Sequence, residues 1–146
     1  KENSYDPQEK EESTEVHPCR GKKKLRELNE FVINDVIQHG HTTGSLELNE
    51  AGEKLFGDLW DGALGRNEVQ KRYKGGVALV NMDQRLYGRP SGTHWVCLVK
   101  GHYYDPLLPN GKEMDIEQNN KEQNCGQRGL AFAMFYLMDP DVAKVV

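Results

Sequence analysis

Residues 126–138 read GQRGLAFAMFYLM and lie just before Pro140 in a chain of 146 residues. Their last part, Leu130 to Met138, is the longest apolar run of the sequence. A segment this long and this apolar predicts a helix buried in the core of one modest domain, and Pro140 is expected to stop it. The run is shorter than the roughly 18 apolar residues that a bilayer-crossing helix needs, so we expect no membrane segment.

Three short segments upstream of this helix predict a small antiparallel sheet that packs on it. Residues 75–83, GGVALVNMD, are an apolar run after two glycines, and residues 93–100, THWVCLVK, form a second strand pattern. Lys100-Gly101 is typical of a tight turn, and residues 102–105, HYYD, begin a third strand. Because helices are expected ahead of the sheet, the predicted fold class is α+β.

The composition of the chain changes near residue 21. Residues 1–21 contain many charges and almost no large apolar side chain, which predicts a disordered or extended acidic tail. Residues 22–146 are then expected to form one folded domain. In its first part, apolar residues recur at helical spacing from Leu25 to Ile37, and Gly40 is a suitable helix end.

The stretch from residue 42 to residue 74 is interpreted as short helices and loops. Asn49 belongs to a residue type that caps helix N-termini, so we expect a helix from there to Phe56, ended by Gly57. Asn67 is expected to cap another short helix that runs through Tyr73.

The overall charge excludes one common function class. A formal net charge of −4 and an isoelectric point of about 5.7 argue against a strong electrostatic DNA-binding protein. One basic run, RGKKKLR at residues 20–26, could bind nucleic acid or another anion. The alternative is a solvent-exposed segment that leads into a helix, which is the usual role of such charge runs.

The three cysteines of the chain are Cys19, Cys97 and Cys125. An odd and widely spaced set does not make a disulfide framework, so a reducing compartment fits the chain better. Cys97, on a predicted strand, is interpreted as a buried apolar side chain. We expect neither a metal ion nor another cofactor, because no structural zinc pattern fits the spacing of His17, Cys19, His39 and His41.

Cys125 stands immediately before the predicted core helix. The first turn of a helix has unpaired backbone N–H groups and the positive end of the helix dipole, and both favour a thiolate over a thiol. A thiolate in this position would be a nucleophile, and Gly126 would let the backbone of a substrate approach closely. The alternative is that Cys125 is a small core residue.

A cysteine nucleophile needs an imidazole that takes and returns a proton, and a group that orients the imidazole. His94 lies on the second predicted strand and Asp105 on the third. A hairpin that turns between these strands would bring the two positions together at the same end. The alternatives are a hydrogen-bonded sheet histidine for His94 and a turn-starting aspartate before Pro106 for Asp105.

Gln118 lies seven residues before Cys125, in a polar and turn-like segment. Acyl transfer needs hydrogen-bond donors that face the negative charge developing on the substrate oxygen. The side-chain amide of Gln118 and the backbone N–H of Cys125 would supply two such donors. The alternatives are that Gln118 is a solvated loop residue and that Gln123 takes its place.

Together these residues resemble the adenovirus protease (adenain) and the related SUMO/ubiquitin-like proteases. The shared motif is His94-Trp95, then Asp105-Pro106, then Gln118-x6-Cys125-Gly126. The spacing between the glutamine and the cysteine is that of the adenovirus branch. Further segments resemble proteases of virophages, Maverick/Polinton elements and large DNA viruses: HGHTT (39–43), KLFGDLWDGAL (54–64), GGVALVNMD (75–83) and Gly92-x-His94-Trp95. The resemblance covers roughly residues 30 to 138.

The resemblance implies a fold of the adenain/SUMO-protease type, with the nucleophilic cysteine at the N-terminus of the buried core helix. It implies catalytic roles for Cys125, His94 and Asp105, with Gln118 at the oxyanion. It also implies a substrate groove that admits small residues such as glycine, with three candidate lining residues, namely Trp95, Gly92 and Gly126.

The function implied by the resemblance is that of a viral cysteine endopeptidase that cleaves capsid or other structural precursors during virion maturation. Its place would be the virion and the host-cell site of assembly, with nucleus or cytoplasm left open. Adenain is activated by DNA and a basic viral peptide. The acidic sequence of this chain gives no reason to expect either activator here, so nucleic acid and an activating peptide stay open as partners. Two alternatives remain: a ubiquitin- or SUMO-type isopeptidase effector, and a catalytically inactive relative that binds capsids.

Overall fold

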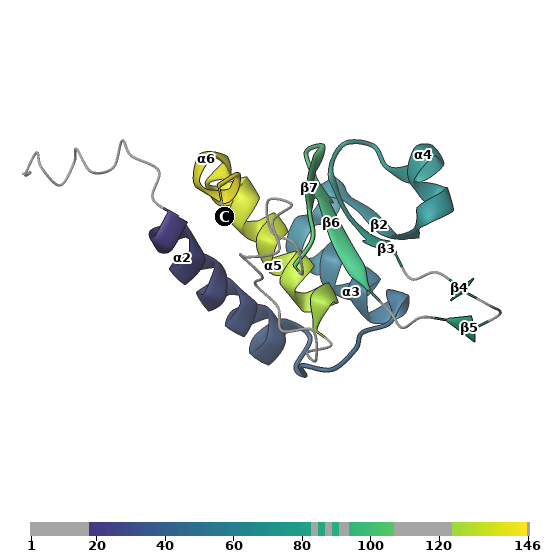
Figure 1. Ribbon diagram of the computed structural model, residues 1–146, viewed down its shortest axis with the longest axis horizontal. Coiled ribbons are helices and arrows are strands. Elements are labelled where there is room, and N and C mark those ends of the chain that lie inside the picture. The colour runs from purple at the N-terminus through teal and green to yellow at the C-terminus, as the bar shows by residue number, and fades with distance from the viewer. Residues whose placement is uncertain (1–17, 83–84, 87–88, 91–93, 107–123, 146) are drawn as a thin grey trace, which may run out of the picture.

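Figure 1 shows the computed structural model, which describes residues 18–82, 85–86, 89–90, 94–106 and 124–145. The helical elements are α2 (Pro18–Phe31) with its π-helical continuation η2 (Val32–Val36), α3 (Ser45–Phe56), the 3₁₀ turns η3 (Gly57–Leu59) and η4 (Arg66–Glu68), α4 (Val69–Arg72), α5 (Cys125–Met138) and α6 (Pro140–Ala143). The strands are β2 (Trp60–Gly65), β3 (Val77–Asn81), β4 (Arg85–Leu86), β5 (Arg89–Pro90), β6 (Trp95–Val99) and β7 (His102–Tyr104). The chain is α+β, as predicted.

The main sheet has the strand order β2-β3-β6-β7, and β4 and β5 form a separate small pair. Strands β3, β6 and β7 are antiparallel neighbours, as the sequence predicts. Strand β2 instead runs parallel to β3. The sheet is therefore mixed, and the prediction of a purely antiparallel sheet is wrong.

Strand β2 lies in the stretch for which the sequence predicts helices and loops. Its residues, WDGALG, include Gly62 and Gly65 and do not alternate between apolar and polar side chains, so the local signals of a strand are missing. The backbone of β2 pairs with the strongly apolar strand β3. This tertiary pairing overrides the weak local preference of the segment.

The hairpin between β6 and β7 turns on two residues in the left-handed conformation, Lys100 with φ 51° and Gly101 with φ 81°. Two such residues make the tight turn whose twist matches that of a hairpin. The register of the two strands then places Asp105 at the same end of the hairpin as His94. The predicted hairpin is confirmed.

Helix α5 is the central element of the core. It lies between β6 on one side and α2 on the other (Figure 1). Gly129 of α5 lies so close to the sheet that a Cβ there would be 2.6 Å from Leu79 Cδ2. Phe132 is fully buried and stacks on Tyr104 with ring centroids 3.8 Å apart. The predicted buried helix is confirmed, and no helix in the described part of the chain is long and apolar enough to cross a membrane.

Helix α2 and its continuation η2 form the predicted N-terminal helix, with Leu25 and Val32 fully buried in the core that includes α5. The helix begins at Pro18, inside the segment assigned to the tail from the sequence. Proline is favoured in the first turn because the N–H that it lacks would have no helical partner there. Residues 1–17, the rest of the predicted tail, lie outside the described residues.

Helix α3 begins earlier than predicted, at Ser45, so Asn49 lies inside the helix instead of at its cap. The Asn49 side-chain oxygen accepts hydrogen bonds from Trp60 Nε1 at 3.0 Å and from the Ala63 N–H at 2.9 Å. Asn49 therefore fastens α3 to β2. The predicted helix end at Gly57 is confirmed, and this glycine has a φ of 56°.

The helix predicted after Asn67 is the turn η4 followed by the short helix α4, which ends at Arg72. Asn67 lies inside η4. The capping bond comes from Glu68, whose carboxylate accepts from the Gly65 N–H at 2.7 Å. The prediction that Asn67 caps this helix is wrong, because a nearby carboxylate satisfies the free backbone donor.

Candidate active site

Cys125 is the first residue of α5 and lies where this helix meets strand β6. Its sulfur accepts a hydrogen bond from the backbone N–H of Trp95 at 3.2 Å. The side chain is buried, with 3% of its surface exposed. A backbone donor at the sulfur and the positive end of a 14-residue helix both stabilise negative charge on Cys125.

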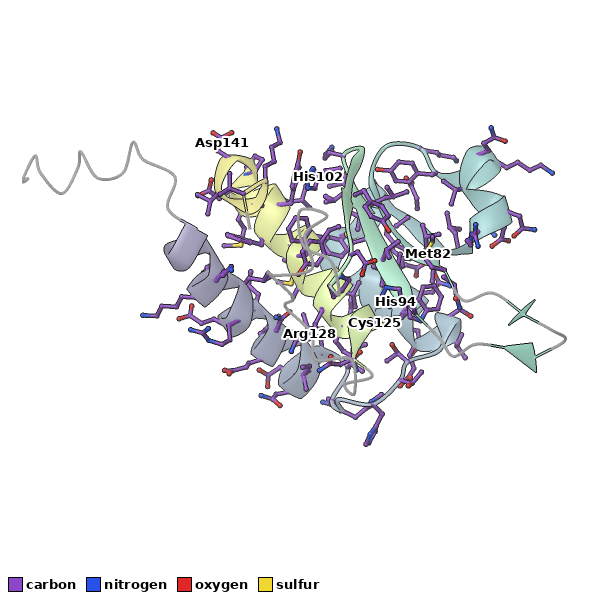
Figure 2. The ribbon with its side chains drawn as sticks, in the orientation of Figure 1. Met82, His94, His102, Cys125, Arg128 and Asp141 are labelled. Carbon is purple, nitrogen blue, oxygen red and sulfur yellow. The ribbon has the colours of Figure 1, made fainter. Side chains whose placement is uncertain are left out.

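His94 lies directly beside Cys125, as Figure 2 shows. The His94 carbonyl accepts from the Met82 N–H at 2.7 Å, which extends the β3–β6 ladder and holds the backbone of His94 in place. The Nε2 atom of the ring is 2.9 Å from Asp105 Oδ1. The imidazole and carboxylate side chains are 26% and 12% exposed. The pairing of His94 with Asp105 is thus as the hairpin predicts.

The electrostatic surroundings of His94 favour its protonated form. The hydrogen bond to Asp105, the largest effect, and the hydrogen bond to Cys125 raise the pKa of the His94 imidazole from 6.5 to about 9. Burial of the ring lowers the pKa and offsets part of this rise. At neutral pH the ring is therefore a cation between a carboxylate and a sulfur atom. Because Asp105 occupies Nε2, Nδ1 is the ring nitrogen left for Cys125.

A sulfur nucleophile, an imidazole and a carboxylate in this order are the groups that nucleophilic acyl transfer uses. The imidazolium can donate a proton to a leaving amine, and the carboxylate can hold the ring in one orientation. Strand β6 and helix α5 position the first two groups, and the end of β7 positions the third. Cys125 belongs to α5, His94 directly precedes β6, and Asp105 directly follows β7.

Trp95 and Gly126, two of the suggested groove residues, are covered by residues 39–44, called here the 39–44 loop. The indole N–H of Trp95 donates to the Thr43 carbonyl at 3.2 Å, and only 3% of Trp95 is exposed. A Cβ on Gly126 would be 2.5 Å from Thr43 Oγ1 and 3.0 Å from Leu48 Cδ2. The close approach that Gly126 permits is therefore that of the chain's own loop. Both residues are therefore packed against the chain's own loop, and their suggested place in a substrate groove stays a prediction.

Gln127 is a positioning residue that the sequence reasoning missed. Its side chain is fully buried, and its Nε2 donates to the carbonyls of His39 at 2.9 Å and His41 at 3.1 Å. These bonds fasten the 39–44 loop to the first turn of the helix that begins with Cys125. A glutamine near the start of an otherwise apolar helix is the sequence feature that could have indicated this role. A buried amide needs hydrogen-bond partners, so such a glutamine predicts a contact with another segment.

The 39–44 loop is also organised from its other side. His39 Nε2 is 2.9 Å from Glu47 Oε2, and His39 Nδ1 accepts from the His41 N–H at 3.1 Å. The rings of His39 and His41 stack at 5.0 Å. This histidine pair, whose spacing in the sequence fits no zinc pattern, thus has a structural role. Among the described residues, no group of three or more His, Cys, Asp or Glu side chains is placed to hold a metal ion.

Replacing Gln127 by leucine is expected to lower the free energy of unfolding by about 1–3 kcal/mol. The reason is that the carbonyls of His39 and His41 lose their hydrogen-bond donor. Urea denaturation measures the effect, and Met138→Leu on the same helix is the control, because Met138 is 59% exposed and its change should cost less than about 0.5 kcal/mol. Equal stability of the two variants would mean that the loop bonds contribute nothing.

Two predicted site residues, Gln118 and Gly92, lie outside the described residues, as does the rival Gln123. Their roles stay predictions. No family model, curated protein or solved structure matches the chain. The assignment of a function therefore depends on the residues and their geometry.

Proposed function

We propose that the protein is a cysteine endopeptidase of the adenain type that cleaves capsid or other structural precursors during virus maturation. The observation that carries the proposal is the arrangement of Cys125, His94 and Asp105 at the meeting point of α5, β6 and β7. This arrangement supports the proposed cysteine-protease chemistry without help from the sequence resemblance. The viral substrate class is supported by the sequence motif that resembles adenain.

In the proposed reaction, the Cys125 thiolate attacks the carbonyl carbon of the scissile peptide, and the carbonyl oxygen becomes negative. When this intermediate collapses, the C–N bond breaks and the His94 imidazolium gives its proton to the leaving amine. The product on the enzyme is a thioester. Neutral His94 then takes a proton from water, the hydroxide attacks the thioester, and the acid product leaves the thiolate behind.

A cleavage assay tests the proposal and separates it from its alternatives. The protein is incubated with Gly-Gly-containing peptides, with candidate capsid precursors and with ubiquitin and SUMO conjugates, beside the Cys125→Ala variant. Cleavage of internal peptide bonds by the wild type alone supports the endopeptidase. Cleavage restricted to the ubiquitin or SUMO conjugates would favour the isopeptidase. Capsid binding without any cleavage would favour the inactive relative.

Gln118→Ala is expected to lower kcat by about 10²- to 10³-fold with little change in KM, the usual result of removing one oxyanion donor. The hydrogen bond would strengthen only as charge develops on the substrate oxygen, so substrate binding should survive. Alkylation of Cys125 should also survive, because it does not need an oxyanion. Gln123→Ala is the matched control and should change kcat far less. If Gln123→Ala were the more damaged enzyme, the motif alignment of this segment would be wrong.

A further inference from the structure

The face of the main sheet that is turned away from α5 carries an apolar hollow of about 200 Å³. Its apolar lining comes from β3 and the adjoining Met82, from β6, β7 and α4: Val69, Val80, Met82, Val96, Leu98 and Tyr103. Arg66 adds one exposed cation. We call this the outer hollow. It is smaller than the roughly 300–1,000 Å³ of pockets that hold whole small molecules, so its size suits an amino-acid side chain.

The outer hollow lies on the same face of the sheet as His94 and Asp105. Side chains alternate along a strand, and Trp95, Cys97 and Val99 of β6 are buried in the core that contains α5. His94 and the hollow residues Val96 and Leu98 therefore project to the other face, and Asp105 shares that face with Tyr103. The hollow and the candidate active site are two parts of one surface.

The distance between the two parts matches a short stretch of extended peptide. Val96 is two residues from His94, which is about 7 Å along the strand at roughly 3.3 Å per residue. Met82 also connects the two, because its side chain lines the hollow while its N–H donates to the His94 carbonyl at 2.7 Å, and Figure 2 shows Met82 near His94. A polypeptide cleaved at Cys125 could therefore reach the hollow with a side chain two to three residues from the cleaved bond.

The lining defines what would bind. Val80 and Val96 are 4% and 1% exposed, and Arg66 is the charged residue of the lining, so a neutral polar side chain among the apolar residues would lose hydration and gain few partners. An apolar side chain would instead remove its own surface and that of the lining from water. Arg66 would add a preference for a carboxylate next to the apolar residue.

We propose that the outer hollow is a specificity subsite that takes one large apolar side chain of the substrate polypeptide. The side chain lies two to three residues from the cleaved bond, and an acidic neighbour faces Arg66. This proposal rests on the protease function proposed above. In this proposal, the sheet face beside the active site determines the substrate specificity of the enzyme.

The test compares peptides that carry leucine or alanine at each position up to three residues from the cleaved bond. Wild-type protein should prefer leucine at one position by at least about 10-fold in kcat/KM, as expected for an apolar pocket. Val69→Phe, which fills the hollow, should reduce this preference to less than about 3-fold. Tyr103→Ala, which widens it at a residue that is 53% exposed, should shift the preference towards phenylalanine. Arg66→Glu should reverse a preference for glutamate over lysine beside the apolar residue.

Labelling of Cys125 by iodoacetamide in the same variants separates the two proposals. The subsite is supported if the hollow variants keep wild-type labelling and lose the leucine preference. The subsite is overturned if the hollow variants keep the wild-type leucine preference, or if the wild type has no leucine preference. The protease proposal is retained in that case, provided that labelling and cleavage depend on His94. Absence of cleavage together with labelling that does not require His94 overturns both proposals.

Discussion

Replacing Cys125 by alanine is expected to abolish peptide cleavage, with kcat reduced by a factor on the order of 10⁶, as when other hydrolases lose their nucleophile. The same change should remove alkylation by iodoacetamide at neutral pH. The physical reason is that Cys125 combines a backbone donor at its sulfur, a helix N-terminus and a cationic imidazole beside it. Mass spectrometry of the labelled protein and steady-state kinetics measure the two effects.

Cys97→Ala is the matched control for this experiment. Cys97 is fully buried in the core, and burial raises the pKa of its thiol. Its thiol should therefore stay neutral and unlabelled in the folded protein, and its removal should leave activity intact. Cys19→Ala should likewise leave cleavage unchanged. Labelling of Cys97 in place of Cys125 would overturn the assignment of the nucleophile.

Replacing Asp105 by alanine is expected to lower kcat/KM by about 10²- to 10⁴-fold, the contribution of a well-positioned acid–base group. It should also move the alkaline limb of the activity profile. In the wild type this limb should lie near pH 9, where the His94 imidazolium loses its proton. Without the carboxylate the pKa of His94 should fall towards 6.5, and the limb should move with it. Asp105→Asn should show a similar shift with a smaller loss, because an amide can still orient the ring.

The same shift predicts how stability depends on pH. The pKa of His94 is higher in the folded protein than its ordinary value of 6.5, so the interactions of the imidazolium stabilise the fold fully below about pH 6.5. This contribution is lost as the pH rises from 6.5 through about 9. The melting temperature of the wild type should therefore fall across this window more than that of Asp105→Asn.

His102 is an internal control for the titration experiment. Burial and the nearby charge of Lys144 lower the pKa of His102, the opposite direction to His94. In nuclear magnetic resonance spectra, the His94 ring should titrate above the ordinary value and the His102 ring below it, and of these two only His94 should respond to Asp105→Asn. An ordinary titration of the His94 ring would mean that Asp105 does not hold the proton on His94.

The candidate site shows which of its features local sequence patterns can predict. The pairing of His94 with Asp105 was predictable, because a two-residue turn at Lys100-Gly101 determines which residues meet across the hairpin. The place of Cys125 at a helix start was predictable from the apolar run that follows it. Gln127 was not, since its acceptors, the carbonyls of His39 and His41, are more than 80 residues away in the chain.

By itself, the sequence determined the elements whose signals are local. These are the core helix α5, the hairpin β6–β7 and the strand β3, where apolar runs, turn residues and a stop at Pro140 need no distant partner. The tertiary structure decided the rest. It made a strand of the glycine-containing β2 by pairing it with β3, and it covered Gly126 with the 39–44 loop. Both outcomes depend on contacts with another segment of the chain, and such contacts leave no recognisable pattern in the sequence of β2 or of the 39–44 loop.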